Sequence, residues 1–207
     1  MRLAGIRLTG PSPRATASTV VAIAAGEYHA PGFEIAPGDR VLDAGANVGA
    51  FAVLAATRGA EVMAYEPHPE TFEHLRRNAA SLRIRPVQAA LVAAGSPATA
   101  RLSMAAGGDT GHSLTAGGDG IEVPARTLED ALTAGCDLLK LDVEGAEFGL
   151  IAGTAPEVLR RARRIVCEVH GWAGDAGELA DRLRAAGYDV TVRDKGRGLA
   201  LLFARLP

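Results

Sequence analysis

The sequence predicts an α/β protein with a doubly wound, mostly parallel sheet of seven strands, and three observations predict it. Apolar runs and helix-patterned segments alternate from Val41 to Tyr188. The first apolar run is followed by the turn Gly45-Ala-Asn-Val-Gly49, and the second ends at Glu66, 23 positions after Asp43. A strand, a glycine turn, a helix and a second strand ending in an acid form half of a nucleotide-binding βαβ unit.

An N-terminal arm, residues 1–38, precedes the predicted core. Within it, Ser18 to Ala25 is either a strand or a short helix. The first half of the sheet is then expected to contain, in order, a strand ending at Asp43, a helix after Gly49, a strand ending at Glu66, a helix that starts with the segment Pro69 to Asn78 and a strand from Ile84 to Ala90.

The stretch from Gly95 to Gly120 is rich in small residues and is expected to form hairpins or a mobile loop, in which His112 and Ser113 could belong to a lid. The second half of the sheet is predicted to contain a short strand at 121–125, a helix opening at Thr127, a buried strand from Asp137 to Asp142, a helix near 155–163, a strand at 164–169, a helix at 176–186 and two antiparallel strands around 188–193 and 198–203. With no internal repeat or long linker, residues 39–207 are expected to be the Rossmann-like core and residues 1–207 one domain.

Composition narrows the classes of function. The chain has 207 residues, 48% of them hydrophobic, a formal net charge of −2 and a pI near 6.2. We therefore expect no general attraction to nucleic acid, and no apolar run reaches the ~20 residues that span a bilayer. Met1 to Gly10 lacks the apolar core of a secretory signal, so a soluble, cytoplasmic protein is expected, without membrane partners.

The chemistry of the glycine turn favours a cofactor without phosphate. The turn departs from the G-x-G-x-x-G fingerprint, since Asn47 stands at the second glycine position, and no lysine or arginine lies between Asp43 and Thr57. A small residue at Gly45 or Gly49 is expected to let a ligand approach the backbone. S-adenosylmethionine, which has an ammonium, a sulfonium and a ribose diol but no phosphate, fits better than NAD.

Polar side chains follow the predicted strand ends, where ligands bind in an open α/β sheet. They are Asp43, Glu66, Asp142 and His170. Lys140 and Asp142 share one side of their strand because side chains alternate with a period of two. Lys140 is therefore expected to be a salt-bridge partner rather than a base.

Five segments in this order resemble the FkbM family of S-adenosylmethionine-dependent methyltransferases. They are Asp43-Ala-Gly-Ala-Asn-Val-Gly49, Glu66-Pro67, Thr127-Leu128, Lys140-Leu-Asp-Val-Glu-Gly-Ala-Glu147 and Glu168-Val-His170, and the resemblance runs from about Phe33 to Tyr188. It implies a Rossmann-like class I methyltransferase fold and, commonly, O-methylation of a sugar, a polyketide or another specialised metabolite.

The resemblance also implies residue roles. Asp43, Gly45, Asn47 and Gly49 would line the methionine end of the cofactor and Glu66 would bind the ribose, with Pro67 and Ala89 as further cofactor-binding residues. Asp142 is expected to accept a hydrogen bond either from the methionine ammonium or from the acceptor. Gln88-Ala-Ala90 stands where many class I enzymes have an acid that holds the adenine amine, so the adenine contacts stay open.

Methyl transfer requires that the acceptor be aligned with the methyl group and that the proton of the acceptor be removed. His170, with an ordinary pKa of ~6.5, is a candidate neutral base, and a structural histidine is an equal alternative. Asp142 and Glu144 are the further catalytic candidates. Asp142, Glu144, Glu168 and His170 could also form an oxygen-rich divalent metal site, which the sequence does not favour.

Two rival functions stay open beside a methyltransferase with a small-molecule acceptor. One is a cofactor-binding accessory protein without catalysis, and the other is a nicotinamide-dependent oxidoreductase, for which no Tyr/Lys proton relay is found. A homodimer is compatible with the sequence but is not required by it.

Overall fold

The computed structural model describes residues 1–103, 114–115 and 120–207. A central sheet of seven strands has the order β12-β13-β11-β10-β3-β4-β5. Its strands, in chain order, are β3 (Arg40–Ala44), β4 (Glu61–Tyr65), β5 (Ile84–Val87), β10 (Leu138–Leu141), β11 (Arg164–His170), β12 (Asp189–Gly196) and β13 (Leu199–Arg205). Only β13 runs antiparallel to its two neighbours, so the predicted doubly wound sheet with an antiparallel last strand is confirmed.

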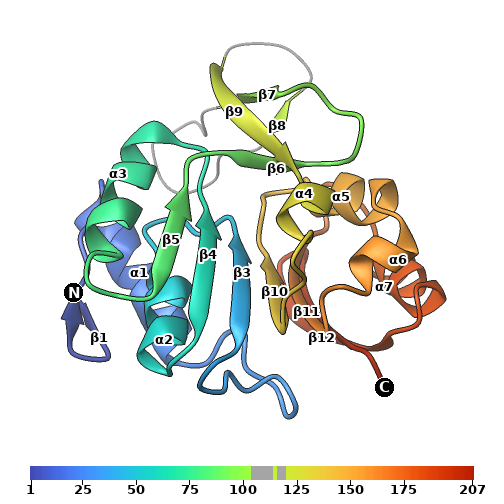
Figure 1. Ribbon diagram of the computed structural model, residues 1–207, viewed down its shortest axis with the longest axis horizontal. Helices are drawn as coiled ribbons and strands as arrows, with labels where there is room; N and C mark the ends of the chain where they lie inside the picture. The colour runs from blue at the N-terminus through green and yellow to red at the C-terminus, as the bar shows by residue number, and fades with distance from the viewer. Residues whose placement is uncertain (104–113, 116–119) are drawn as a thin grey trace.

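Helices cover both faces of this sheet (Figure 1). They are α1 (Pro13–Ala24), α2 (Ala50–Thr57), α3 (Pro69–Asn78), α4 (Leu128–Ala131), α5 (Glu147–Gly153), α6 (Pro156–Leu159) and α7 (Ala176–Ala185). Alternate strand residues enter two separate cores. Val41 packs with α1 and α2, whereas Leu42, its neighbour in β3, packs with α5 and α7.

A second sheet lies above the carboxyl ends of the central strands (Figure 1). It has the order β6-β9-β7-β8, formed by β6 (Ala90–Val92), β7 (Thr99–Leu102), β8 (Leu114–Thr115) and β9 (Ile121–Thr127). The hairpins expected between Gly95 and Gly120 are thus found in part, and His112 and Ser113 lie outside the described residues. The prediction of one strand from Ile84 to Ala90 is wrong, because the chain leaves the central sheet at Gln88 and joins the second sheet at Ala90.

The N-terminal arm contains a helix, α1, that is longer than the strand or short helix expected at Ser18 to Ala25. It begins earlier because the Ser12 hydroxyl caps it by accepting from the Ala15 amide, directly before Pro13. A short hairpin, β1 (Arg2–Leu3) with β2 (Ile6–Arg7), precedes it.

Helices between β10 and β11 differ from the prediction. The sequence predicts one helix near 155–163, whereas the structure has α5 at Glu147–Gly153 and the four-residue α6. Glycines at 149 and 153 lower helix propensity and hide α5 from pattern reasoning. In the described part of the chain, no helix is long and apolar enough to cross a membrane.

Candidate active site

Two pockets open at the carboxyl ends of the central strands, and they meet at four shared residues. The first pocket extends from this junction over Glu66 and Ala89, and the second extends over His170. Both are lined by Gly45, Asn47, Asp142 and Glu144. A molecule in the first pocket can therefore reach one in the second at the ends of β3 and β10.

The glycine turn that separates β3 from α2 is fixed by packing. Gly45 has φ +73°, and a Cβ there would lie 1.8 Å from the carbonyl oxygen of Asp142. Gly49 has φ +86°, and its Cβ would lie 2.6 Å from Leu75 Cδ1. Gly45 lines both pockets, so close approach of a ligand there stays a prediction, although a Cβ would also collide with the protein. Gly49 lines neither pocket, and a Cβ there would meet Leu75. Asn47, with φ +52°, has a left-handed backbone that asparagine tolerates better than most residues.

The Glu66 carboxylate is buried at the end of β4 and joins the turn to the next loop. Its Oε2 accepts from the Asn47 amide at 2.9 Å, and its Oε1 accepts from the His68 amide at 2.8 Å. Burial raises the pKa of Glu66 to about 7, against the lowering effect of these two hydrogen bonds. Each oxygen keeps one acceptor position for a ligand hydroxyl.

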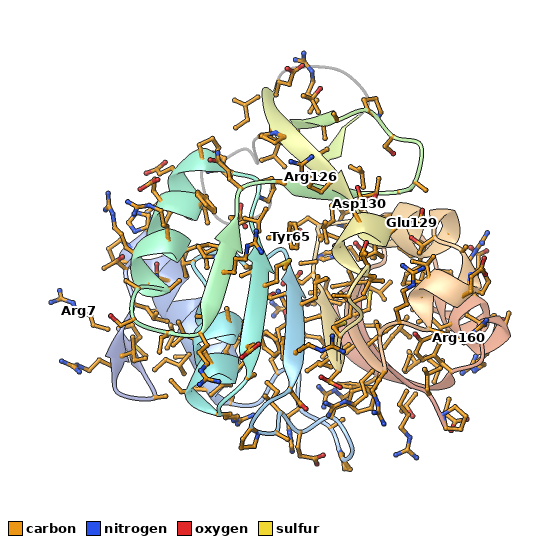
Figure 2. All side chains as sticks on the ribbon, viewed as in Figure 1. Arg7, Tyr65, Arg126, Glu129, Asp130 and Arg160 are labelled. Carbon is orange, nitrogen blue, oxygen red and sulfur yellow. The ribbon has the colours of Figure 1, made fainter. Side chains whose placement is uncertain are left out.

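The charge of the first pocket favours a cationic ligand. Four of its lining residues are acids, Glu66, Glu70, Asp142 and Glu144, and its described lining contains no lysine or arginine. A pyrophosphate would lack a cationic partner there. An ammonium or sulfonium next to the strand ends would be stabilised. Pro67 and Ala89 line the same pocket, as does Tyr65 at the end of β4. In the view of Figure 2, Tyr65 is labelled beneath Arg126.

Asp43 and Lys140 form a buried pair beneath the two pockets. They are register partners on β3 and β10, and Lys140 Nζ lies 3.0 Å from Asp43 Oδ1. Lys140 also donates to the Gly45 carbonyl at 2.8 Å. Burial alone would lower the pKa of Lys140, but the charges of Asp43 and Asp142 outweigh it and raise that pKa. Burial raises the pKa of Asp43, and Lys140 opposes this rise.

This arrangement bears out the expectation that Lys140 is a salt-bridge partner rather than a base. Asp43 is fully buried and lines neither pocket, and Gly49 also lines neither. Both residues therefore stand behind the pocket wall and hold the turn.

His170, the last residue of β11, is held by a carboxylate on each side. Its Nδ1 lies 2.9 Å from Oε1 of the fully buried Glu147, which also accepts from the His170 amide at 2.8 Å. Its Nε2 lies 3.3 Å from Glu144 Oε2. Burial would lower the pKa of His170, but Glu147 and then Glu144 raise it to about 9. This raised pKa favours a protonated ring at pH 7 in the ligand-free site, so His170 would have to lose its own proton before it could act as a base.

Asp142 is held by a tyrosine from the arm. The Tyr28 hydroxyl lies 2.9 Å from Asp142 Oδ2 and 3.0 Å from Glu168 Oε2, and its single proton can serve only one of them at a time. Lys195, near the end of β12, bridges Glu168 and Glu27 at 2.6 Å each. The last long hairpin thus ties the arm to the strand ends.

Glu144 has an unusual backbone, with φ +50°. A left-handed conformation costs a residue with a Cβ roughly 1–2 kcal/mol and persists only where the surroundings impose it. Here it places the half-buried carboxylate at the junction of the two pockets. Such strain is common at functional sites.

The second pocket is lined by polar residues of the central strands and by residues of the arm. The strands contribute Lys140, Glu168 and His170, and α1 contributes small and apolar residues, among them Thr19 and Ala22. Trp172 is 68% exposed, lies over Gly145 and lines neither of these two pockets.

The structure brings together the predicted Asp142, Glu144 and His170, and it adds residues that sequence reasoning missed. Glu147 and Tyr28 contact these side chains from α5 and the arm, and Lys195 and Glu27 support them. Glu147 is the last residue of the segment from Lys140 to Glu147, which carries part of the family resemblance. No sequence pattern links Tyr28 to Asp142, which is 114 positions away.

Comparison with known proteins identifies relatives. The family model described as the methyltransferase FkbM domain matches residues 43–190. The 31-O-demethyl-FK506 methyltransferase FkbM of Streptomyces tacrolimicus is 32% identical in an alignment that covers 77% of this chain and 76% of that protein.

Solved structures agree on the fold. The methyltransferase domain of METTL16 superposes with a TM-score of 0.57 at 17% identity, covering 98% of this chain and 73% of that one. Magnesium protoporphyrin IX methyltransferase from Synechocystis PCC 6803, solved with bound S-adenosylmethionine, gives 0.53 at 15% identity, covering 94% and 81%. At this identity, the likeness extends to the fold alone.

Proposed function

Because the chain belongs to the FkbM methyltransferase family, we propose that it transfers the methyl group of S-adenosylmethionine to a hydroxyl oxygen of a small acceptor. The observation that carries this proposal is the junction of an acid-lined pocket with a second pocket at Asp142 and Glu144. The donor occupies the first pocket and the acceptor the second.

The residues of the first pocket suit the donor. Glu66 accepts hydrogen bonds from the ribose hydroxyls, and Asp142 and Glu144 stabilise the cationic methionine end. Pro67 and Ala89 border the adenosine, while Asp43 acts indirectly through Lys140 and the turn. When bound, the donor supplies an electrophilic methyl carbon on a sulfonium.

The strand-end cluster, defined as Asp142, Glu144 and His170, faces the acceptor. The hydroxyl oxygen forms a bond to the methyl carbon as the carbon–sulfur bond breaks, and its proton leaves toward the cluster. His170 can take this proton only after losing its own. An arriving cationic donor favours that loss by opposing the field of the surrounding acids.

Calorimetry with S-adenosylmethionine and with NAD tests the donor. Tight NAD binding without S-adenosylmethionine binding would support the nicotinamide oxidoreductase and remove this proposal. A panel of hydroxylated acceptors, assayed by release of S-adenosylhomocysteine, tests turnover. Donor binding with no turnover across a broad panel would favour the accessory protein instead.

A further inference from the structure

The strand-end cluster has the composition and spacing of a divalent-cation site. Asp142, Glu144 and His170 each offer one ligand atom, and these atoms lie within 4.8 Å of one another. They converge because Asp142 and Glu144 follow β10, while His170 ends β11, the parallel neighbour of β10.

The imidazole is aimed at this cluster by a residue outside it. Glu147 accepts from both the ring Nδ1 and the backbone amide of His170, at 2.9 and 2.8 Å, so the ring cannot turn freely. A buried carboxylate that holds one ring nitrogen and leaves the other toward the site is the usual support of a metal-binding histidine.

The distance between His170 Nε2 and Glu144 Oε2 fits two ligands of one ion. In the structure these two atoms lie 3.3 Å apart. Ligand atoms about 2.1 Å from a metal and about 90–110° apart are separated by roughly 3.0–3.4 Å.

The closest contacts of the two lysines at this sheet end lie outside the cluster. Lys140 contacts Asp43 and the Gly45 carbonyl more closely than Asp142, whose Oδ2 is 3.6 Å away, and Lys195 bridges Glu27 and Glu168. Among the ion pairs of the described residues, Glu144 has His170 as its partner. Glu144 therefore has no lysine or arginine among its ion-pair partners in the described residues.

We propose that Asp142, Glu144 and His170 bind one divalent transition-metal ion that accepts mixed nitrogen and oxygen ligands, with Mn²⁺ as its probe. The side chains of Asp142 and Glu144 are 25% and 33% exposed, so the remaining coordination positions face the two pockets. The role of the ion rests on the proposed function. A hydroxyl oxygen bound to it has a lowered pKa and loses its proton to solvent, and His170 then acts as a ligand instead of taking that proton.

The test is titration of metal-free, full-length protein with Mn²⁺, followed by the loss of the free-ion electron paramagnetic resonance signal and by calorimetry. We expect one ion per chain in the wild type. Glu144→Gln and His170→Gln should lose detectable binding, and Glu147→Gln should weaken it about 10- to 100-fold through the histidine alone. Glu178→Gln, an exposed acid on α7, is the matched control and should bind as the wild type does.

A wild-type protein that binds no Mn²⁺ would overturn the inference, as would binding that survives in both Glu144→Gln and His170→Gln. Thermal unfolding of each variant separates loss of the site from loss of the fold, and the wild-type titration needs no variant. S-adenosylmethionine binding is measured separately. If the protein binds S-adenosylmethionine but no Mn²⁺, the proposed function stands, with His170 as the proton acceptor. If it binds Mn²⁺ but no S-adenosylmethionine, the ion site stands and the proposed function is refuted.

Discussion

Replacing Glu66 by alanine is expected to weaken S-adenosylmethionine binding by about 10²- to 10⁴-fold at pH 8. The Glu66 oxygens already accept from the Asn47 and His68 amides, and each has one acceptor position left for a ribose hydroxyl. Two charge-assisted hydrogen bonds contribute roughly 1.5–3 kcal/mol each, or about 3–6 kcal/mol together. Each 1.4 kcal/mol corresponds to about a tenfold change in affinity.

The pH dependence of donor binding follows from the same residue. The pKa of Glu66 is raised from 4.5 to about 7, so the buried carboxyl stabilises the ligand-free fold below pH 4.5, and this contribution is lost as the pH rises through 7. Donor binding has the opposite dependence because the ribose hydroxyls need the ionised acceptor. Affinity in the wild type should therefore rise about tenfold between pH 6 and pH 8.

Calorimetry with S-adenosylmethionine at pH 6 and pH 8 measures both effects. Glu73→Ala is the control, since this exposed carboxylate on α3 pairs with Arg76 outside the pocket and should leave affinity unchanged. In Glu66→Ala the tenfold pH dependence should disappear along with the affinity. An affinity within threefold of the wild type at pH 8 would show that the ribose is held elsewhere.

Three further outcomes are expected. His170→Ala should slow release of S-adenosylhomocysteine about 10²- to 10⁴-fold with little change in donor affinity. If the rate and the donor affinity fall by the same factor, the role of His170 is not confined to the acceptor step. Gly45→Ala should lower the thermal midpoint far more than Gly38→Ala, because both have positive φ but only the Gly45 Cβ would collide with backbone; equal shifts would contradict this. Lys140→Met should lower the free energy of unfolding, measured in urea, by about 3–5 kcal/mol because it leaves the Asp43 carboxylate buried and unpaired. Adding Asp43→Asn to this variant should restore much of the lost stability. If Lys140→Met alone is as stable as the wild type, the two residues are not coupled.

The N-terminal arm contributes residues to the second pocket, and no pattern in its sequence predicted this. Tyr28 reaches Asp142 and Glu168, and α1 lines the second pocket. Both lie outside the residues 43–190 that match the family model, as does Lys195. The second pocket is therefore completed by segments on both sides of the part of the chain that matches the family model.

Much of the architecture was predictable because its signals are local. The continuous apolar runs, the proline at the start of α3 and the glycine turn each specify an element within about ten residues, and the start of the helix at Pro69 was predicted. Prediction was wrong where local signals were weak or conflicting. Glycines obscured α5, and the break between β5 and β6 depends on which sheet each segment joins.

The sequence by itself determined the fold class, the acid-rich ends of β4 and β10, and the family, since each depends on residue order and short spacings. Only the tertiary structure decided which groups meet. Glu147 and His170 are 23 positions apart on different elements, and Tyr28 and Asp142 are 114 apart. Their contacts depend on the order of β10 and β11 in the sheet and on the path of the arm across it. Those contacts also set the protonation of His170, because the field at a buried group is the sum over all neighbours in space rather than along the chain.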